Sequence, residues 1–287
     1  MSKTGQMILK ILIIILVLAF AGWIAWDNSR IVLTTITVKS ERLPGAFDGY
    51  RIAQVSDLHN DEFGENNEKL ITLLVEAAPD MIAITGDLLD SRRTSVEKVL
   101  NFVQQAVQIA PCYYVTGNHE SRLKEYAQLE EEMRKAGALV LRDEKVTLEK
   151  DGTEMIVLGI DDPRFKLSTD KQYKMESVIG EVLTGLLKDT ERETFTMLLS
   201  HRPELFDLYC EYDIDVVLSG HVHGGQFRLP VIGGIFGPSQ GIIPAYDAGL
   251  YTKDTTNMVV SRGLGQSIIP FRVNNPPELV LIELKSE

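Results

Sequence analysis

Short apolar runs alternate with helical segments over residues 51–136, and this alternation constrains the fold more than any other feature. The runs are RIAQVSD (51–57), MIAITGD (81–87) and CYYVTGN (112–118). Between them, residues 66–78 and 94–110 carry apolar side chains at helical spacing, and a third helix is expected to end near Ala136. Strands that alternate with helices of this length predict an α/β layered fold.

The rest of the chain departs from this alternation. Residues 31–40 are β-branched and partly alternating, which predicts a strand. Residues 139–161 are typical of two or three antiparallel strands, with a turn at Asp151-Gly152. The other expected elements are one helix and four strands, at 174–188, 194–201, 213–221, 257–262 and 278–284. A single domain over residues 31–287 is the simplest division.

The N-terminal segment is a membrane signal. Residues 7–26, MILKILIIILVLAFAGWIAW, contain Lys10 as their only charged residue and have about the length that a helix needs to cross a bilayer. Trp23 and Trp26 lie where the aromatic belt of a membrane helix is expected. We therefore expect one N-terminal transmembrane helix.

The charges around this helix predict its orientation. Lys3 and Lys10 favour a cytoplasmic N-terminus, with the rest of the chain on the outer side of the cell membrane. Residues 1–30 are thus expected to be a retained single-pass anchor and residues 31–287 an extracytoplasmic domain. The alternative is a cleaved signal peptide, because the AFA sequence at 19–21 resembles a cleavage site.

Charge and cysteine content exclude some classes of protein. The formal net charge of −12 disfavours nonspecific nucleic-acid binding, because an acidic protein repels phosphate backbones. Cys112 and Cys210 are too few for a disulfide framework, and we expect two unpaired thiols.

Five expected strands end in side chains that can bind metals. These side chains are Asp57 and His59, Asp87, Asn118 and His119, His201, and His221 with His223. All five histidines of the chain fall in these motifs, whereas solvated surface histidines would also occur elsewhere. Because α/β sheets bind ligands at the carboxyl ends of their strands, the coincidence predicts a metal site.

The residue types indicate which ions fit. Carboxylates with neutral imidazoles suit Mn²⁺, Fe or Zn²⁺, and about seven candidate ligands exceed the needs of one tetrahedral ion. Two divalent cations that share one carboxylate would use them all. We expect Mn²⁺, with Fe, Zn²⁺ or Mg²⁺ as alternatives. Glycines at 86, 117 and 220 precede three of the motifs and permit close approach of the backbone.

Taken together, the motifs resemble the full signature of the calcineurin-like metallophosphoesterases, from about Arg51 to Gln226. They are Asp57-x-His59, Gly86-Asp87, Gly117-Asn118-His119-Glu120, His201 and Gly220-His221-x-His223. The GGQ at 224–226 and the tail sequences GLY (249–251), SRGLG (261–265) and PE (277–278) are similar to the membrane-associated bacterial branch. The resemblance implies two mixed β-sheets packed as a sandwich and flanked by helices, a four-layer αββα arrangement.

The resemblance also implies a role for each motif residue. Two ligand sets would share the carboxylate of Asp87: Asp57, His59 and His223 for the first metal, and Asn118, His201 and His221 for the second. His119 would not bind metal but would steady the transition state and protonate the leaving oxygen, while a metal-bridging hydroxide attacks phosphorus. Glu120 would orient a ligand or His119. We expect Asp90, Asp161 and Asp162 to be caps or supporting groups.

The sequence does not determine the substrate. A lipid-linked or envelope phosphoester is one possibility, and a soluble substrate of a tethered phosphodiesterase or nucleotidase is another. A metal-binding scaffold or sensor with little turnover is a third. Residues 227–246 bear on the choice, because this apolar segment is rich in glycine and proline. It is either a buried loop with edge strands or an apolar rim that dips into the bilayer and admits a lipid phosphoester.

Overall fold

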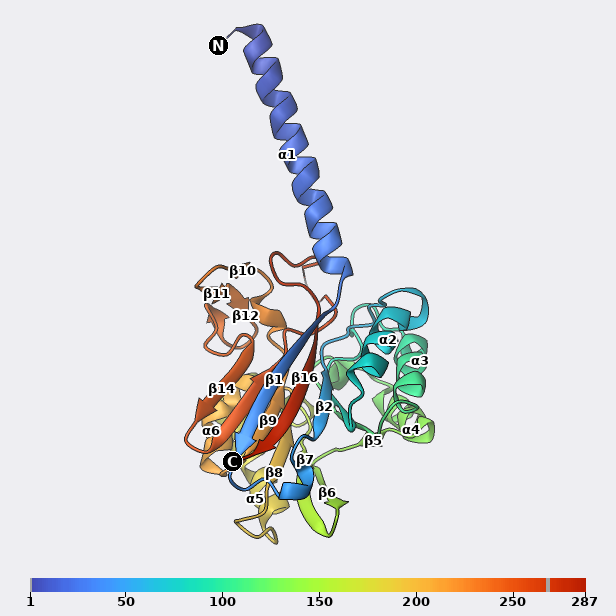
Figure 1. The fold of residues 1–287 in the computed structure, drawn as a ribbon, viewed down its shortest axis with the longest axis vertical. Helices are drawn as coiled ribbons and strands as arrows, with labels where there is room; N and C mark the ends of the chain where they lie inside the picture. Colours follow the sequence, from blue (N-terminus) through green and yellow to red (C-terminus); the bar gives the residue numbers. More distant parts are fainter. Residues whose placement is uncertain (1, 267–268) are drawn as a thin grey trace.

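Two six-stranded mixed sheets form the centre of the structure, a computed structural model that describes residues 2–266 and 269–287 (Figure 1). The first sheet has the order β1 (Val32–Ser40), β16 (Glu278–Ser286), β2 (Arg51–Val55), β3 (Met81–Thr85), β4 (Cys112–Val115) and β5 (Leu139–Val140). The second has the order β14 (Gly249–Lys253), β15 (Thr256–Val260), β9 (Val216–Ser219), β8 (Thr196–Leu199), β7 (Thr153–Gly159) and β6 (Glu144–Lys150).

Strand direction makes both sheets mixed. In the first sheet β16 runs antiparallel to β2, and the other neighbours are parallel. In the second sheet the outer pairs β14–β15 and β6–β7 are antiparallel, and the inner strands are parallel. The carboxyl ends of β2, β3, β4, β8 and β9 therefore each open into a loop that can contribute to a site.

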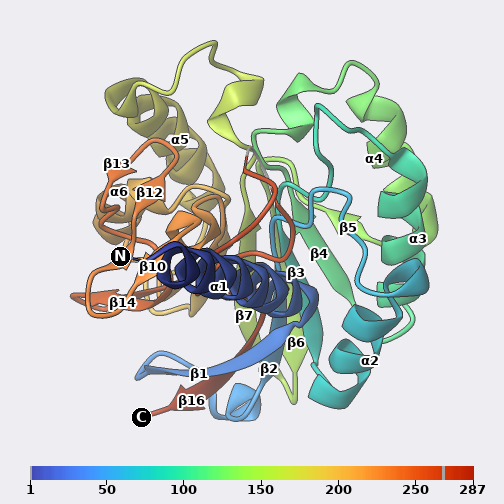
Figure 2. The same ribbon diagram turned by 90° about the horizontal axis from the view of Figure 1, so that it is seen from above.

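Helices cover the outer face of each sheet, and Figure 2 shows them on opposite sides of the sandwich. The first sheet packs against α2 (Glu68–Ala77), α3 (Val96–Ala106) and α4 (Tyr126–Ala136), and the second against α5 (Gln172–Leu187) and α6 (Phe206–Glu211). Short 3₁₀ helices lie at Gly45–Phe47, Glu65–Asn67, Glu120–Arg122, Pro163–Phe165, Pro203–Leu205 and His223–Gly225. The expected four-layer sandwich is confirmed.

Burial on both faces explains why the central strands are continuously apolar. In β3, Ile82 and Ile84 pack against the helices, while Met81 and Ala83 pack between the two sheets. Side chains alternate between the faces of a strand, so a strand covered on both sides needs apolar residues at every position. This is why the sequence shows runs rather than an alternating pattern.

Residues 139–161 fold partly as expected. β6 and β7 form an antiparallel hairpin with its turn at Asp151-Gly152, which confirms that part of the prediction. β5, however, pairs in parallel with β4 in the first sheet. It follows α4 as a crossover strand, so a strand expected among antiparallel partners belongs to the parallel sheet. Cys112 and Cys210 are free, as predicted.

The N-terminal helix α1 (Lys3–Ser29) rises from one end of the sandwich (Figure 1). Its 27 residues extend for about 40 Å, and it is long and apolar enough to cross a membrane. Apart from its last turn, its side chains are mostly exposed. Asp27 in that turn is buried and pairs with Arg30 at 2.7 Å.

Residues 227–246 form two small hairpins near the end of the sandwich from which α1 rises (Figure 1). Their strands are β10 (Arg228–Leu229) with β11 (Gly233–Gly234), and β12 (Phe236–Gly237) with β13 (Gly241–Ile242). Large apolar side chains of these hairpins are exposed, and we call them the apolar rim: Leu229, Val231, Ile232, Phe236, Ile242 and Ile243. The interpretation of this segment as a buried loop is wrong for these side chains.

Candidate metal centre

The five ligand-bearing loops meet at one end of the interface between the two sheets. The eight polar residues predicted for the site are all at most 6% exposed: Asp57, His59, Asp87, Asn118, His119, His201, His221 and His223. Parallel strands place their carboxyl ends at the same edge, so loops that are far apart in the sequence converge there.

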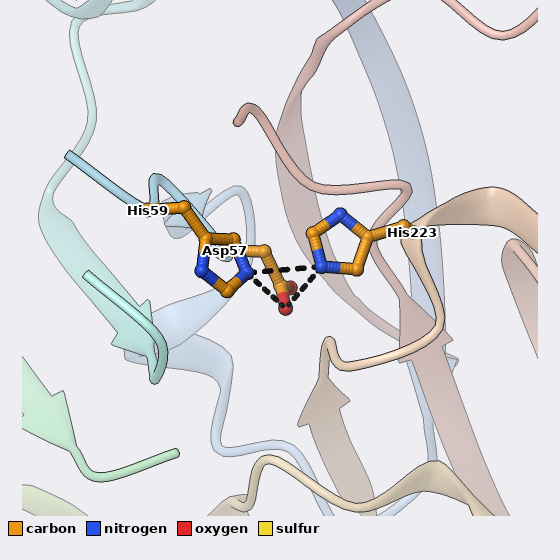
Figure 3. Close-up of side chains that lie close together, drawn as sticks. All are labelled: Asp57, His59 and His223. Atoms are coloured by element: carbon orange, nitrogen blue, oxygen red, sulfur yellow. Dashed lines mark hydrogen bonds and ion pairs between the residues drawn. The ribbon is translucent and has the colours of Figure 1, made fainter. Parts of the chain in front are cut away.

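Asp57, His59 and His223 form the first group of potential ligands (Figure 3). Nε2 of His59 lies 3.0 Å from Nε2 of His223. Oδ1 of Asp57 lies 3.4 Å from Nε2 of His223 and 3.9 Å from Nε2 of His59. Figure 3 shows the three side chains pointing toward one another from separate segments of the chain.

Asp87 joins this group to a second one, which contains His201 and His221. Oδ2 of Asp87 lies 3.3 Å from Nε2 of His201 and 3.7 Å from Nε2 of His59. Nε2 of His201 lies 3.2 Å from Nδ1 of His221. The carboxylate of Asp87 therefore stands between the two groups.

Unsatisfied polar atoms in the site fit a pair of cations. Oδ1 of Asn118 is buried and has no hydrogen-bond partner among residues 2–266 and 269–287. Such an orphaned acceptor costs free energy unless a ligand contacts it. Carboxylate, imidazole and amide donors together match Mn²⁺, Fe or Zn²⁺. The residues present thus fit two divalent cations with a shared carboxylate.

The backbone of the site is strained. Asp57, His59, Asp87, His221 and His223 all have positive φ angles, between 50° and 72°. A left-handed conformation is unfavourable for a residue with a Cβ, and such residues cluster at functional sites. Here it turns each of these side chains toward the common centre at the end of its strand.

The glycines that precede the ligands permit this close approach. A Cβ at Gly117 would overlap the carboxylate of Asp87, and one at Gly220 would overlap Ser56 and Asp57. A Cβ at Gly86 would lie 2.7 Å from Nδ1 of His201. The predicted reason for these glycines is confirmed.

The family comparison agrees with this geometry, because the sequence model of the calcineurin-like phosphoesterases matches residues 50–225. The chain belongs to this family. It is 31% identical over 265 residues to the metallophosphoesterase YkuE of Bacillus subtilis (strain 168), covering 91% of this chain and 87% of that protein. It is therefore a metallophosphoesterase and a hydrolase of phosphoesters.

Two further similarities extend along most of the chain. A transmembrane protein with metallophosphoesterase domain from Danio rerio is 28% identical over 284 residues, which are 96% of this chain and 62% of that protein. Among solved structures, TT1561 of Thermus thermophilus has a TM-score of 0.53 at 15% identity, covering 75% of this chain and 90% of that one. The second likeness shows the fold.

His119 of the metallophosphoesterase lies beside the ligand groups in a defined tautomer. The backbone N–H of Ser91 donates to Nδ1 of His119 at 3.1 Å, so the proton of the neutral ring is on Nε2. Oδ1 of Asp90 lies 3.6 Å from the same Nδ1. Burial lowers the pKa of His119, although Asp87 and Asp90 oppose this shift. The ring is therefore neutral at pH 7.

Two of the supporting carboxylates act in ways that the sequence left open. Glu120 accepts hydrogen bonds from the backbone N–H groups of Gly117, Asp87 and Leu89, at 2.9, 3.0 and 3.3 Å. It holds two ligand loops together through their backbone. Asp90 both accepts a backbone hydrogen bond from Arg92 and faces His119, so it is more than a cap.

Two buried arginines contact metal-ligand candidates, and neither was predicted. Nη1 of Arg202 lies 3.0 Å from Nε2 of His221, and Nη2 of Arg272 lies 3.1 Å from Nδ1 of His223. Asp162, which was expected to be a cap or a supporting group, accepts from Arg202 at 3.0 Å and therefore supports the site. Because Arg202 directly follows the predicted ligand His201, the sequence could have indicated that it lies near the site. Arg272 lies in the C-terminal part of the chain outside every motif, so nothing in the sequence indicated its position.

A cavity of about 390 Å³ opens beside the ligand groups. Asn118, His119, His221 and His223 are among the residues that line it. Its wall combines the cationic side chains of Arg92, Arg122 and Arg202 with apolar ones from Val222, Phe236 and Ile269. The cavity can thus accept a phosphate group that carries an apolar substituent.

Proposed function

We propose that the protein hydrolyses a phosphoester at a binuclear metal centre. The observation that carries this proposal is the position of the Asp87 carboxylate between two groups of buried ligands, at 3.3 Å from His201 and 3.7 Å from His59. In this proposal Asp57, His59 and His223 would hold one ion, Asn118, His201 and His221 would hold the other, and Asp87 would be shared by both.

The cations supply the electrophilic part of the chemistry. When bound, two divalent cations lower the pKa of a water molecule and offset the negative charge of the phosphoryl group. Carboxylate, imidazole and amide ligands favour Mn²⁺, with Fe, Zn²⁺ and Mg²⁺ as alternatives. Glu120 and the two buried arginines keep the ligands in place, because they contact the ligand loops or the ligand rings themselves.

His119 is the proposed catalytic residue that assists the leaving group. Its Nδ1 accepts from the backbone of Ser91, so the neutral ring presents Nε2–H as a hydrogen-bond donor. A neutral imidazole is too weak an acid to give up this proton, so the ring stabilises the charge that develops on the departing oxygen. The side chain lines the cavity, where Nε2–H can reach the oxygen of a departing alcohol. Its backbone N–H donates to Oδ1 of Asp87 at 2.8 Å, which couples its position to the bridging ligand.

We further propose that residues 1–30 anchor the enzyme and residues 31–287 form the catalytic domain. The apolar stretch 7–26 of α1 spans the cell membrane, and the lysines at its start hold the N-terminus in the cytoplasm. The substrate is then a lipid-linked or envelope phosphoester. A soluble substrate is the alternative, with the anchor setting only the location.

Metal-dependent hydrolysis tests the proposed function. The full-length chain in detergent is treated with a chelator and assayed with soluble aryl phosphate monoesters and diesters, with and without added Mn²⁺. We expect no turnover after chelation and recovery when Mn²⁺ is returned. Full activity of the chelated protein would reject the mechanism. Stoichiometric Mn²⁺ binding without turnover of either ester would instead support a metal-binding scaffold or sensor.

A further inference from the structure

The apolar rim is a concentrated exposed hydrophobic surface. Val231 is fully exposed, and the exposed fractions of Ile242, Ile243 and Phe236 are 77%, 59% and 54%. Single exposed apolar residues are ordinary, but six of them on two consecutive hairpins indicate a surface that another apolar phase covers.

The rim lies beside the point where α1 leaves the sandwich. Figure 1 shows β10, β11 and β12 at the same end of the molecule as the last turn of α1. In Figure 2, seen from above, α1 is tilted so that its N-terminal part projects over these hairpins. A bilayer crossed by α1 would therefore reach the rim.

Hydrogen bonds fix the rim relative to the helix. Asn28 of α1 bonds to both backbone groups of Arg272. At the base of the rim, the N–H of Arg228 donates to the carbonyl of Val273 at 3.0 Å. The amide of Gln226 donates to the carbonyl of Phe271 at 2.6 Å. Residues 271–273 thus join the end of α1 to the hairpins without a flexible linker.

The same surface leads into the cavity of the metal centre. Phe236 belongs to the rim and also lines the cavity, and Ile269 lines it from the neighbouring loop. Asn118 and His119 lie on the same cavity. An amphiphile whose apolar part contacts the rim can therefore place a phosphate group at the metal centre.

We propose that the apolar rim is a bilayer-contact surface, which holds the mouth of the cavity at the level of the lipid headgroups. Its partner is the membrane that α1 crosses, because that membrane is the apolar phase that the fixed helix brings next to the rim. The substrate class that follows is a membrane phospholipid, and this part of the inference rests on the proposed function.

Fluorescent labelling tests the contact independently of catalysis. Full-length protein in which Cys112 and Cys210 are replaced by alanine is labelled with an environment-sensitive dye at Val231→Cys or Ile242→Cys, and reconstituted in phosphatidylcholine–phosphatidylglycerol vesicles. Val75→Cys is the matched control, since Val75 is 57% exposed and belongs to α2, away from the rim. We expect spin-labelled lipids to quench the dye at 231 and 242 but not at 75.

Two results of this labelling would overturn the proposal. One is a dye at 231 and 242 that is as accessible to an aqueous quencher as the dye at 75. The other is a dye that both quenchers fail to reach, in a protein that cross-links as a dimer, which would assign the rim to a second copy of the chain. Quenching of the dye does not depend on turnover. A protein without the proposed enzymatic activity would therefore still report its contact with lipid and with the aqueous quencher.

Turnover tests the substrate class. Val231→Ser, Ile232→Ser, Ile242→Ser and Ile243→Ser are combined, and the control combines Val75→Ser with Leu139→Ser, which are exposed elsewhere. We expect the rim variant to lose roughly tenfold in hydrolysis of phosphatidic acid or phosphatidylglycerol in vesicles, through poorer positioning, and to keep its activity on a soluble aryl ester. Equal losses on both substrates, no loss on either, or cleavage of the aryl ester alone would overturn the phospholipid assignment.

Discussion

Asn28, in the last turn of α1, is hydrogen-bonded to both backbone groups of Arg272. Its side-chain carbonyl accepts the N–H of Arg272 at 2.7 Å, and its amide donates to the carbonyl of Arg272 at 2.9 Å. The guanidinium of Arg272 in turn donates to Nδ1 of His223 at 3.1 Å. A single residue therefore connects the end of the N-terminal helix to a candidate metal ligand.

Replacing Asn28 with alanine should weaken the site as well as the helix junction. The change leaves the N–H and the carbonyl of Arg272 without these partners, at a cost of about 1–3 kcal/mol in the free energy of unfolding. We expect a lower melting temperature and a lower kcat/KM for a soluble aryl phosphoester. Ser29→Ala is the matched control, because the Ser29 hydroxyl donates to the nearby carbonyl of Trp26 within the same helix. Identical behaviour of the two variants would contradict the connection.

His119→Ala should reduce turnover while the metal stays bound. Removal of one donor that stabilises a developing oxyanion typically costs about 10²–10³-fold in kcat. The metal ligands are untouched, so metal content measured by mass spectrometry should equal that of the wild type. Asp87→Ala is the contrasting variant and should lose both metal and activity. If His119→Ala lost its metal as Asp87→Ala does, His119 would be a ligand, and its assignment as the group that assists the leaving oxygen would be wrong.

Metal binding should become tighter as the pH rises. Burial opposes a charged His201 ring, but Asp87, Asp57 and Asp162 together raise its pKa from 6.5 to about 10. In chelator-treated protein the ring is therefore protonated at pH 7, and a cation must displace that proton. The affinity for Mn²⁺ should rise ~tenfold per pH unit below the folded pKa, with release of a proton. Calorimetric titration in two buffers of different ionisation enthalpy measures both quantities.

The raised pKa of His201 also makes the stability of the chelated protein depend on pH. In contrast to the metal affinity, this stability falls as the pH rises. Because the folded pKa of His201 lies above the unfolded value of 6.5, its contribution to the chelated fold is fully present below pH 6.5. It is lost as the pH rises through about 10. Chelated protein should thus become less stable over this window, as followed by urea unfolding. A pH-independent affinity for Mn²⁺ would show that His201 is neutral in the chelated protein.

Gly117→Ala should disrupt the bridging ligand. The added Cβ would overlap the carboxylate and the backbone nitrogen of Asp87, neither of which can move without displacing a ligand loop. We expect loss of metal and a drop in activity of at least the ~10²-fold that a misplacement of about 1 Å can cause. Gly185→Ala in α5 is the control, since nothing lies within 4 Å of its added Cβ, and it should be neutral or stabilise by up to about 1 kcal/mol. Full activity of Gly117→Ala would contradict the predicted overlap.

The sequence alone determined the class of fold and the residues that meet at the site. Continuous apolar runs such as Met81–Thr85 end in Gly-Asp or Gly-Asn, and parallel strands must bring these ends to one edge. The nearness of Asp57 to Asp87, which follow neighbouring parallel strands of the first sheet, was therefore expected, whereas His201 follows β8 of the second sheet and reaches them through the packing of the two sheets. Periodicity and composition carry this information because each element is local in the chain.

Only the tertiary structure decided which distant side chains contact the ligands and which apolar residues stay exposed. Arg272 and His223 are separated by 49 positions, and no spacing rule relates them. β5 joins the parallel sheet because it returns beside β4 after α4, although its neighbours in sequence form a hairpin. The exposure of Val231 and Ile242 depends on what the rest of the chain leaves uncovered, a property of the packed molecule that no segment encodes by itself.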